Sequence, residues 1–329
     1  MKTSPKAGDK KSVLGLATEN FLAPLPLPTG RKPNNTMGMV WRINDTYMDV
    51  SDCTPGAVVA TVHFTLVCTL LILWWIIYYM GGVDIFMNFG GLLLISVFVF
   101  LPIIVIIVSV YAKPRQPLRF NRQRREVCVP ATRGGDYWYV PWETVKASVE
   151  GVNTVSQGGV NRNGSLIIGF SNPNFKGEVK LASNGFSNNE HAERQLYFPN
   201  VVPEVGAGMW ELIRTYMEEG PDKINVDTDL FHVRNDTILK QYIEAVKESI
   251  AKHGLAKGLL EGIFGLFLLN ILLVYYIERK HLSPPPDLLG DEVEAWSQPL
   301  PQEQWAKRSP ELEQALREYE AKQEQKSVA

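Results

Sequence analysis

Residues 57–80 (AVVATVHFTLVCTLLILWWIIYYM) and residues 85–112 (IFMNFGGLLLISVFVFLPIIVIIVSVYA) are two apolar stretches separated by the tetrapeptide GGVD. Neither stretch contains a lysine or an arginine. An α-helix needs about 20 apolar residues to cross the roughly 30 Å hydrocarbon core of a bilayer. Because both stretches reach this length and lie in tandem, the sequence predicts a transmembrane α-hairpin over residues 57–112, and therefore a membrane protein.

Basic residues flank this predicted hairpin, and its turn has none. Six of them follow the second stretch: Lys113, Arg115, Arg119, Arg122, Arg124 and Arg125. Since positively charged segments stay on the cytoplasmic side of a membrane, we expect both flanks in the cytoplasm, at a bacterial inner membrane. The same cluster would suit nucleic acid, but membrane topology and contact with membrane lipids already account for it. The formal net charge of -2 also provides no general attraction to a polyanion.

The segment before the hairpin is polar. Residues 1–56 are expected to form a flexible cytoplasmic tail, since their first part is rich in Pro, Gly, Asn, Thr and Lys. No apolar signal region occurs there, so the first apolar stretch is expected to direct the chain to the membrane. The cysteines, Cys53, Cys68 and Cys128, have no CxxC or metal-ligand spacing. This pattern is typical of a reducing compartment and not of a disulfide framework.

Residues 113–253 have the pattern of a cytoplasmic α+β domain. From 126 to about 185, β-branched and aromatic runs alternate with turn signals, including Asn-Gly pairs at 163–164 and 184–185. Asn-Gly between apolar runs is a strong hairpin signal, so we expect an antiparallel sheet of four or five strands. Helical periodicity follows over 203–219, with Trp210 facing inward, and over 237–253, after Asp236 as N-cap. Strands followed by helices indicate an α+β domain.

A third apolar run lies within residues 254–278 and is long enough to span a membrane, although it contains Glu261 and Asn270. Basic residues on both sides leave its direction open, and a buried or interfacial helix is the alternative. Tyr275 and Tyr276 resemble an interfacial aromatic belt and favour a third transmembrane helix. Residues 279–329 then form a polar tail, with a short helix predicted after Ser309.

Glycines recur every four residues at the start of this third run: Gly254, Gly258 and Gly262, with Gly265 one turn further on. Small residues at this spacing allow two membrane helices to approach closely. The pattern predicts a helix-packing seam, either within the chain or between copies. A seam between copies would make the protein a homo-oligomer through its third helix. A seam within the chain is the alternative.

The sequence contains no recognisable catalytic set. His191 and Glu193 form an H-x-E pair, but the P-C-x-x-C that accompanies it in zinc deaminases is missing. P-loop, G-x-S-x-G and G-x-G-x-x-G motifs are also missing. Glu261 and His63 lie in apolar runs, where ionisable residues are functional candidates, but two or three helices are too few for a typical transporter. We therefore expect no enzyme, with no catalytic, cofactor-binding or metal-binding residues.

Two short motifs carry a family resemblance: FNRQRREV at 120–127 and YVPWETV at 139–145. A basic segment that leaves a membrane hairpin and continues into such strands resembles bacterial pleckstrin-homology-like domains fused to membrane hairpins. More narrowly, residues 57 to about 220 resemble a family of uncharacterised proteobacterial membrane proteins often encoded beside type VI secretion effectors. The resemblance implies an immunity or accessory protein of a secreted toxin, and it implies no toxin-contacting residue.

The leading hypothesis is an inner-membrane-anchored protein-binding module whose partners are membrane lipids and a protein, such as a secreted toxin or a secretion component. An anchor raises the local concentration of a binding domain at one surface and so strengthens weak binding. One alternative is a sensor of anionic lipids that uses the arginines of residues 119–125. The other is a membrane-active toxin that oligomerises through the glycine seam.

Overall fold

The computed structural model describes residues 5–13, 17–35, 39–51, 55–79, 99–108, 111, 115–131, 136–156, 159–179, 185–199, 201–224, 238–282 and 286–328. The chain divides into two compact units that alternate along the sequence. Unit 1 comprises Met1–Asp52, Gln116–His232 and Asp287–Ala329, and unit 2 comprises Cys53–Arg115 and Val233–Pro286. Each unit is thus assembled from segments that are far apart in the chain.

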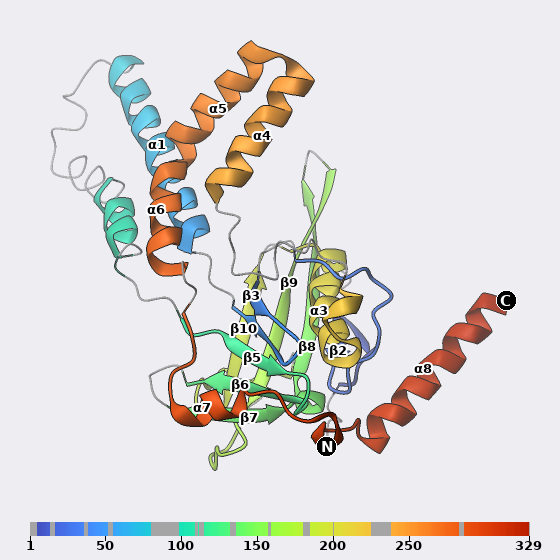
Figure 1. The fold of residues 1–329 in the computed structure, drawn as a ribbon. Helices are drawn as coiled ribbons and strands as arrows, with labels where there is room; N and C mark the ends of the chain where they lie inside the picture. The colour runs from blue at the N-terminus through green and yellow to red at the C-terminus, as the bar shows by residue number, and fades with distance from the viewer. Residues whose placement is uncertain are drawn as a thin grey trace. The chain divides into compact units, whose positions relative to one another are not determined.

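Unit 1 is built on two antiparallel sheets of five strands each (Figure 1). The first sheet has the order β1-β2-β8-β9-β10, with bounds Lys10–Val13, Ala17–Ala23, Lys146–Ser156, Gly159–Ser171 and Glu193–Pro199. The second has the order β3-β4-β5-β6-β7, with bounds Val40–Ile43, Tyr47–Val50, Leu118–Asn121, Glu126–Pro130 and Tyr137–Pro141. Helix α3 (Pro203–Glu219) packs on β8 and β9.

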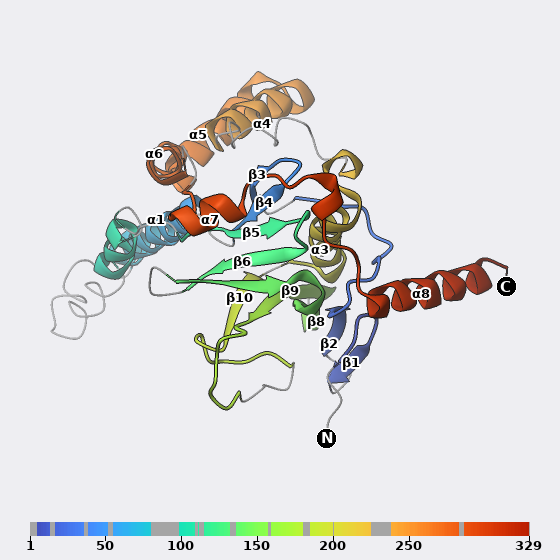
Figure 2. The same cartoon turned by 60° about the horizontal axis from the view of Figure 1, so that its bottom comes forward.

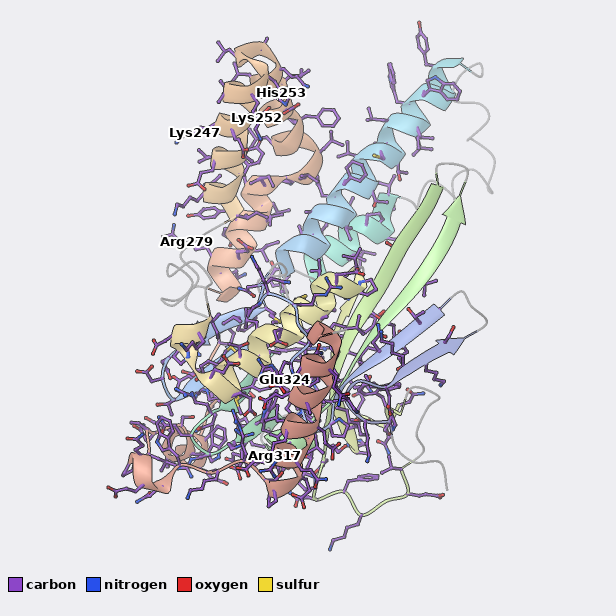
Figure 3. The ribbon with its side chains drawn as sticks, turned by 90° about the vertical axis from the view of Figure 1, so that its right-hand side faces the viewer. Lys247, Lys252, His253, Arg279, Arg317 and Glu324 are labelled. Carbon is purple, nitrogen blue, oxygen red and sulfur yellow. The ribbon has the colours of Figure 1, made fainter. Side chains whose placement is uncertain are left out.

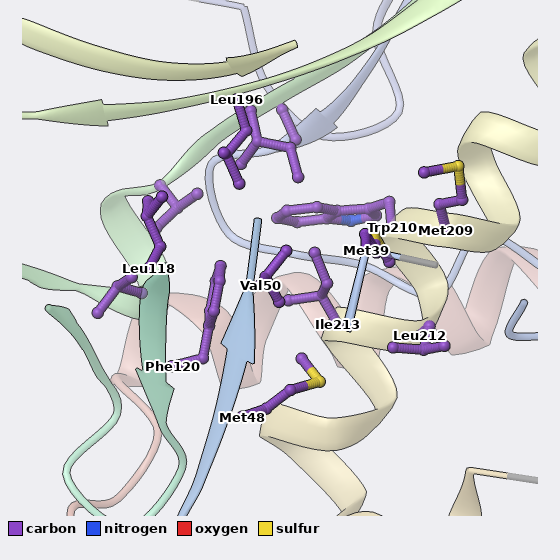
Figure 4. Close-up of a cluster of buried hydrophobic side chains, with 14 of the residues drawn as sticks. Met39, Met48, Val50, Leu118, Phe120, Leu196, Met209, Trp210, Leu212 and Ile213 are labelled. Atoms are coloured by element: carbon purple, nitrogen blue, oxygen red, sulfur yellow. The ribbon is translucent and has the colours of Figure 1, made fainter. Parts of the chain in front are cut away.

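The main core of unit 1 joins both sheets to α3. Strand β9 turns Leu166, Ile168 and Phe170 to one face, which is the period of two that a half-buried strand shows. Trp210 on α3 is fully buried, as expected, and stacks on Trp142 with 5.3 Å between ring centroids. Figure 4 shows members of this cluster: Met39, Met48, Val50, Leu118, Phe120, Leu196, Met209, Trp210, Leu212 and Ile213. Burial of such side chains contributes roughly 1.5–3 kcal/mol each.

Strands β5 and β6 are buried on both faces. They are too short for the sequence pattern to have indicated this. In β5, Leu118 and Phe120 enter the main core, while Arg119 and Asn121 are buried on the opposite face. In β6, Cys128 is likewise buried on that outer face. The outer face is covered by the C-terminal part of the chain, where α7 (Asp291–Trp296) and α8 (Pro310–Val328) occur. Figure 2 shows α7 beside the second sheet and α8 projecting beyond the strands.

The N-terminal region is not the flexible tail that its composition predicted. It supplies β1, β2, β3 and β4 to the two sheets of unit 1. The predicted sheet over 126 to about 185 is also divided, because β6 and β7 join the second sheet while β8 and β9 join the first. The single pleckstrin-homology-like sheet is therefore wrong, whereas the α+β class holds. Each sheet is completed by strands from the distant N-terminal segment, because β2 pairs with β8 and β4 pairs with β5.

Unit 2 contains four helices among its described residues: α1 (Pro55–Tyr79), α4 (Ile238–His253), α5 (Leu255–Leu269) and α6 (Ile271–Leu282), together with a helical stretch at Val99–Val108. Helix α1 packs against α5 and α6, and α4 packs against α5 and α6. A small buried cluster of Val59, Val274 and Ile277 lies where α1 meets α6. Unit 2 is therefore a helical assembly in which α1, from its first segment, packs against helices from its second segment.

The predicted transmembrane hairpin and third transmembrane helix are both contradicted. Among the described residues, no single helix is long and apolar enough to cross a membrane. In α1, the apolar stretch described with its side chains is Val62–Trp75, and residues 85–98, 109–110 and 112 of the second predicted span lie outside the described residues. The third run is broken at Asn270, which is left-handed at φ 48° and ψ 52° and separates α5 from α6. Only taken together, with a 57° bend, do those two helices reach the length and composition of a span among the described residues.

Candidate functional site

The outer face of the second sheet and the segment that lies on it are joined by polar and aromatic contacts. We call residues 286–311 the C-terminal strap. The strap contains α7 and a 3-10 turn at Gln302–Gln304, and it ends in the first turn of α8. Its two ends are held to the rest of unit 1 by ion pairs, and its centre is held by apolar and hydrogen-bonding contacts.

Arg119 fastens the first end of the strap. It lies opposite Asp49 in the antiparallel register of β4 and β5, and it makes a bidentate pair with that carboxylate at 2.7 and 2.8 Å. The same guanidinium donates to Asp287 at 2.7 Å and to the Ser297 hydroxyl at 2.9 Å, and it lies 3.9 Å from the ring centre of Tyr47. Burial by itself lowers the pKa of Arg119, but the hydrogen bonds and charge of Asp49 outweigh it and raise that pKa. The arginine therefore stays charged beneath the strap.

Side chains of the second sheet bind the main chain of the strap. Asn121 Nδ2 and Arg124 Nε both donate to the carbonyl oxygen of Trp296, at 3.1 and 3.0 Å. Gln123 accepts from the strap at two points, through its Oε1 from the Leu300 amide at 2.6 Å and through its carbonyl from the Ala306 amide at 2.8 Å. The sheet thus satisfies the peptide groups of the strap, which would otherwise be costly to bury.

Apolar side chains of the strap fill the space between these polar contacts. Leu288, Val293 and Trp296 form a buried cluster with Cys128, against which Tyr137 and Tyr139 pack. The rings of Tyr139 and Trp296 are 5.1 Å apart, and the Trp296 indole donates to Glu126 at 3.0 Å. This burial raises the pKa of the Cys128 thiol to about 12. Cys128 is consequently a protonated, shielded thiol under the strap.

Glu218, at the end of α3, fastens the other end of the strap. It accepts from Arg125 Nη2 at 2.7 Å, from the Trp142 indole at 2.8 Å and from Arg308 Nε at 2.7 Å. Burial raises the pKa of Glu218, but these donors, Arg125 first, outweigh it and lower that pKa. Glu143 joins the network by pairing with Arg125 at 3.0 Å. An ionised, buried carboxylate therefore holds the strap to the core tryptophan.

Four of the six basic residues assigned from the sequence to the membrane surface contact the strap or its anchors. Arg119, Arg124 and Arg125 do so as described, and the Arg122 guanidinium lies 5.2 Å from the ring centre of Trp305. Arg115 is exposed at the start of the same segment, and Lys113 lies outside the described residues. The sequence reading missed the partners of these arginines. A signal for them was present, because the largely polar tail contains two tryptophans, Trp296 and Trp305.

The predicted glycine seam is occupied within the chain. A Cβ at Gly258 would clash with both the side chain and the backbone of Ile250. A Cβ at Gly262 would press against Val246, and one at Gly265 would clash with Tyr242. All three glycines therefore allow α4 to approach α5 closely. Gly254 has a different role, since it forms the turn between the two helices at φ 87° with open space around it.

The remaining candidate residues make local contacts. His63 on α1 has its Nε2 3.0 Å from the carbonyl oxygen of Phe267 on α5. Glu261 accepts from the Ser249 hydroxyl across the α4–α5 pair. His191 is exposed in the loop before β10, whereas Glu193 is buried and pairs with Lys146 at 3.0 Å. No group of three metal-ligating side chains occurs in the portion of the chain that the structure describes.

Unit 2 carries a second candidate surface, made of exposed apolar side chains. Many lie on α1, α5 and α6, and the most exposed of those are Leu71, Ile72, Trp74, Trp75, Tyr78, Leu255, Leu260, Phe264, Phe267, Leu272 and Tyr276. Phe267 is 74% exposed, which is unusual for such a ring. Helix α4 instead presents charges, and Figure 3 shows Lys247, Lys252 and His253 along it. Large apolar side chains exposed in such numbers are a feature of surfaces that bind membranes or proteins.

Comparison with known proteins leaves these two surfaces as the basis for any function. No family model, no curated protein and no solved structure matches this chain.

Proposed function

We propose that this protein is a protein-binding module that associates with a lipid bilayer through unit 2. The observation that carries the proposal is the set of exposed apolar side chains on α1, α5 and α6. Leaving them in water forfeits about 25 cal/mol for each Å² of apolar surface, and a lipid phase would recover it. The association envisaged is partial insertion of a helical surface, without a membrane-spanning hairpin.

The contrast between the charged exposed side of α4 and the apolar exposed side of α5 supports a lipid environment. Helix α5 turns its glycines to α4, while Leu260, Phe264 and Phe267 remain exposed. Helix α4 carries lysines and glutamates on its exposed side and uses Tyr242 and Val246 against α5. A polar helix paired with an apolar one is suited to the boundary between headgroups and acyl chains.

Unit 1 is the proposed binding module. Its contribution is a double-sheet scaffold whose outer face already binds a peptide segment, the C-terminal strap, by side-chain contacts. Attachment to a bilayer would raise the effective concentration of this face at the membrane surface. A role as immunity or accessory protein in type VI secretion, at a bacterial inner membrane, rests on the sequence resemblance and stays a prediction.

The structure offers less support for the two alternatives. A lipid sensor based on residues 119–125 needs free arginines, but Arg119 and Arg125 are buried in ion pairs with Asp49 and Glu218. An oligomerising toxin needs a free glycine seam, but α4 of the same chain covers Gly258 and Gly262. We therefore propose neither.

Flotation with liposomes tests the proposal. Full-length protein is mixed in detergent with phosphatidylcholine, the detergent is removed, and the bound fraction is measured after centrifugation through a density gradient. We expect the wild type to float. The triple variant Leu260→Glu, Phe264→Glu, Phe267→Glu should bind at least about tenfold less, because a charge within the hydrocarbon costs roughly 2.5–3.5 kcal/mol.

The matched control places three glutamates at exposed apolar positions of unit 1: Val152→Glu, Tyr197→Glu and Leu289→Glu. This variant should float as the wild type does. A wild type that stays at the bottom of the gradient, or two triple variants that lose flotation equally, would overturn the proposal.

A further inference from the structure

The C-terminal strap has the features of a ligand bound to unit 1. We infer that the outer face of the second sheet is a peptide-binding site, and that the strap is its internal, displaceable occupant. The external occupant is a segment of the protein partner that, like the strap, contains one short helix between extended parts. It carries an acidic residue ahead of apolar anchors spaced like Leu288, Val293 and Trp296. The inference rests on the proposed function only in assuming that unit 1 binds a protein.

The first argument is that the strap lies outside the main core. The buried residues of that core come from positions 23–224, whereas Leu288, Val293 and Trp296 belong to a separate cluster with Cys128. The two sheets and α3 therefore pack together without any strap residue. Removal of the strap would expose a surface and leave the scaffold's own packing in place.

The second argument is the way in which the strap is bound. Asn121, Gln123 and Arg124 contact carbonyl and amide groups of its main chain. Tyr137 adds a hydroxyl that accepts from the Leu289 amide at 2.9 Å. Contacts to main-chain groups do not depend on the side chains of the bound segment, so they suit any peptide of the same backbone path. Specificity would then come from the pockets for the apolar anchors.

The third argument concerns charge. Arg119 Nη2 and Arg42 Nη1 meet the Asp287 carboxylate at 2.7 and 3.2 Å, so an acidic residue is required ahead of the anchors. Asp287 is 52% exposed and Arg308, at the other end, is 39% exposed. Each pair joins a buried partner, Arg119 or Glu218, to an exposed one, so water and salt reach it from the exposed side. Both ends of the strap can therefore open before its buried centre does.

A peptide corresponding to residues 286–309, labelled with fluorescein, tests the inference by anisotropy with full-length protein in detergent. The wild type should bind it poorly because its own strap fills the site. Trp296→Ala in the protein, with tryptophan retained in the peptide, removes the main anchor of the internal strap. Apparent affinity should then rise roughly 100-fold, since it scales with the fraction of molecules whose site is open.

Leu289→Ala is the matched control, because Leu289 is in the same strap but 73% exposed. Peptide affinity of this variant should equal that of the wild type. A peptide with alanine at position 296 should bind none of the proteins. Asp287→Asn weakens the attachment of the strap less than Trp296→Ala does, and it serves as a second variant if Trp296→Ala fails to fold. It should increase the affinity for the peptide by a smaller factor.

Alkylation of Cys128 in a Cys53→Ser, Cys68→Ser background reports opening independently. Its rate should rise in Trp296→Ala and stay unchanged in Leu289→Ala. The inference is overturned if Cys128 becomes reactive without peptide binding, since the exposed face is then no binding site. It is equally overturned if neither readout changes in folded Trp296→Ala and Asp287→Asn. No bilayer is present, so these outcomes do not depend on flotation.

Discussion

The two faces of the second sheet are covered by different parts of the chain. On the inner face, Leu118 and Phe120 of β5 pack in the main core against α3 and the first sheet. On the outer face, the alternating residues Arg119 and Asn121 are equally buried, but beneath the strap. The inner face is therefore apolar and continuous, whereas the outer face combines a small apolar cluster with charged and main-chain contacts. This difference makes one face a permanent core and the other a candidate recognition surface.

The largest expected effect is on the inner face. Trp210→Ala should lower the free energy of unfolding by about 3–5 kcal/mol, because Trp210 is fully buried and stacked on Trp142. Urea unfolding followed by circular dichroism measures this loss. A loss below about 1 kcal/mol would mean that the inner face is not the dominant core.

Loss of one buried charge on the outer face should lower the free energy of unfolding by nearly as much. Arg119→Met leaves the fully buried Asp49 carboxylate with Arg42 as its remaining basic partner, at 3.2 Å. Removing one member of a buried ion pair costs about 3–5 kcal/mol, and the remaining pair should reduce this toward the lower figure. The double variant Arg119→Met, Asp49→Leu should recover part of the lost stability. If it recovers none, the cost arises from lost strap contacts and not from the orphaned carboxylate.

Acidification should loosen the outer face through Glu218. Its pKa is lower in the folded protein than in the unfolded chain, so the folded state binds fewer protons and stability rises with pH. The contribution is complete above the unfolded pKa of about 4.3 and is lost as pH falls through the folded pKa. Glu218→Gln should therefore have a smaller decline in unfolding free energy between about pH 5 and 3. Parallel pH profiles of wild type and variant would contradict this assignment.

The smallest expected change in the free energy of unfolding concerns Glu19 in the first sheet. Glu19 and Glu150 lie directly opposite each other on β2 and β8, and burial followed by the Glu150 charge raises the pKa of Glu19. The folded state then binds more protons than the unfolded chain, so this site loses stability as pH rises above about 4.3. Glu19→Gln should increase the free energy of unfolding at pH 7 by roughly 0.2–1 kcal/mol, the range for opposed like charges. No gain at pH 7, or the same gain at pH 3, would exclude this repulsion.

Local signals in the sequence were sufficient for some elements. Helix α3 has the predicted bounds Pro203–Glu219, because apolar residues recur at helical period before Gly220 and Pro221. Helix α4 follows the predicted pattern too, and the glycine spacing anticipated a packing seam. The two helices are set by neighbours within one or two turns of the same helix, and the seam joins α5 to α4, which directly precedes it in the chain. Strand pairing is not local, which is why the N-terminal strands and the division into two sheets were missed.

The sequence by itself determined the apolar character of unit 2, the α+β class of unit 1 and the positions of its basic residues. Tertiary structure decided what those residues do. Arg119 and Arg125 read as surface charges until the fold places Asp49 and Glu218 beside them. Asp287 is 168 residues from Arg119 in the chain. A contact at that separation leaves no periodic trace in the sequence, since it depends on how both segments fold around the same sheet.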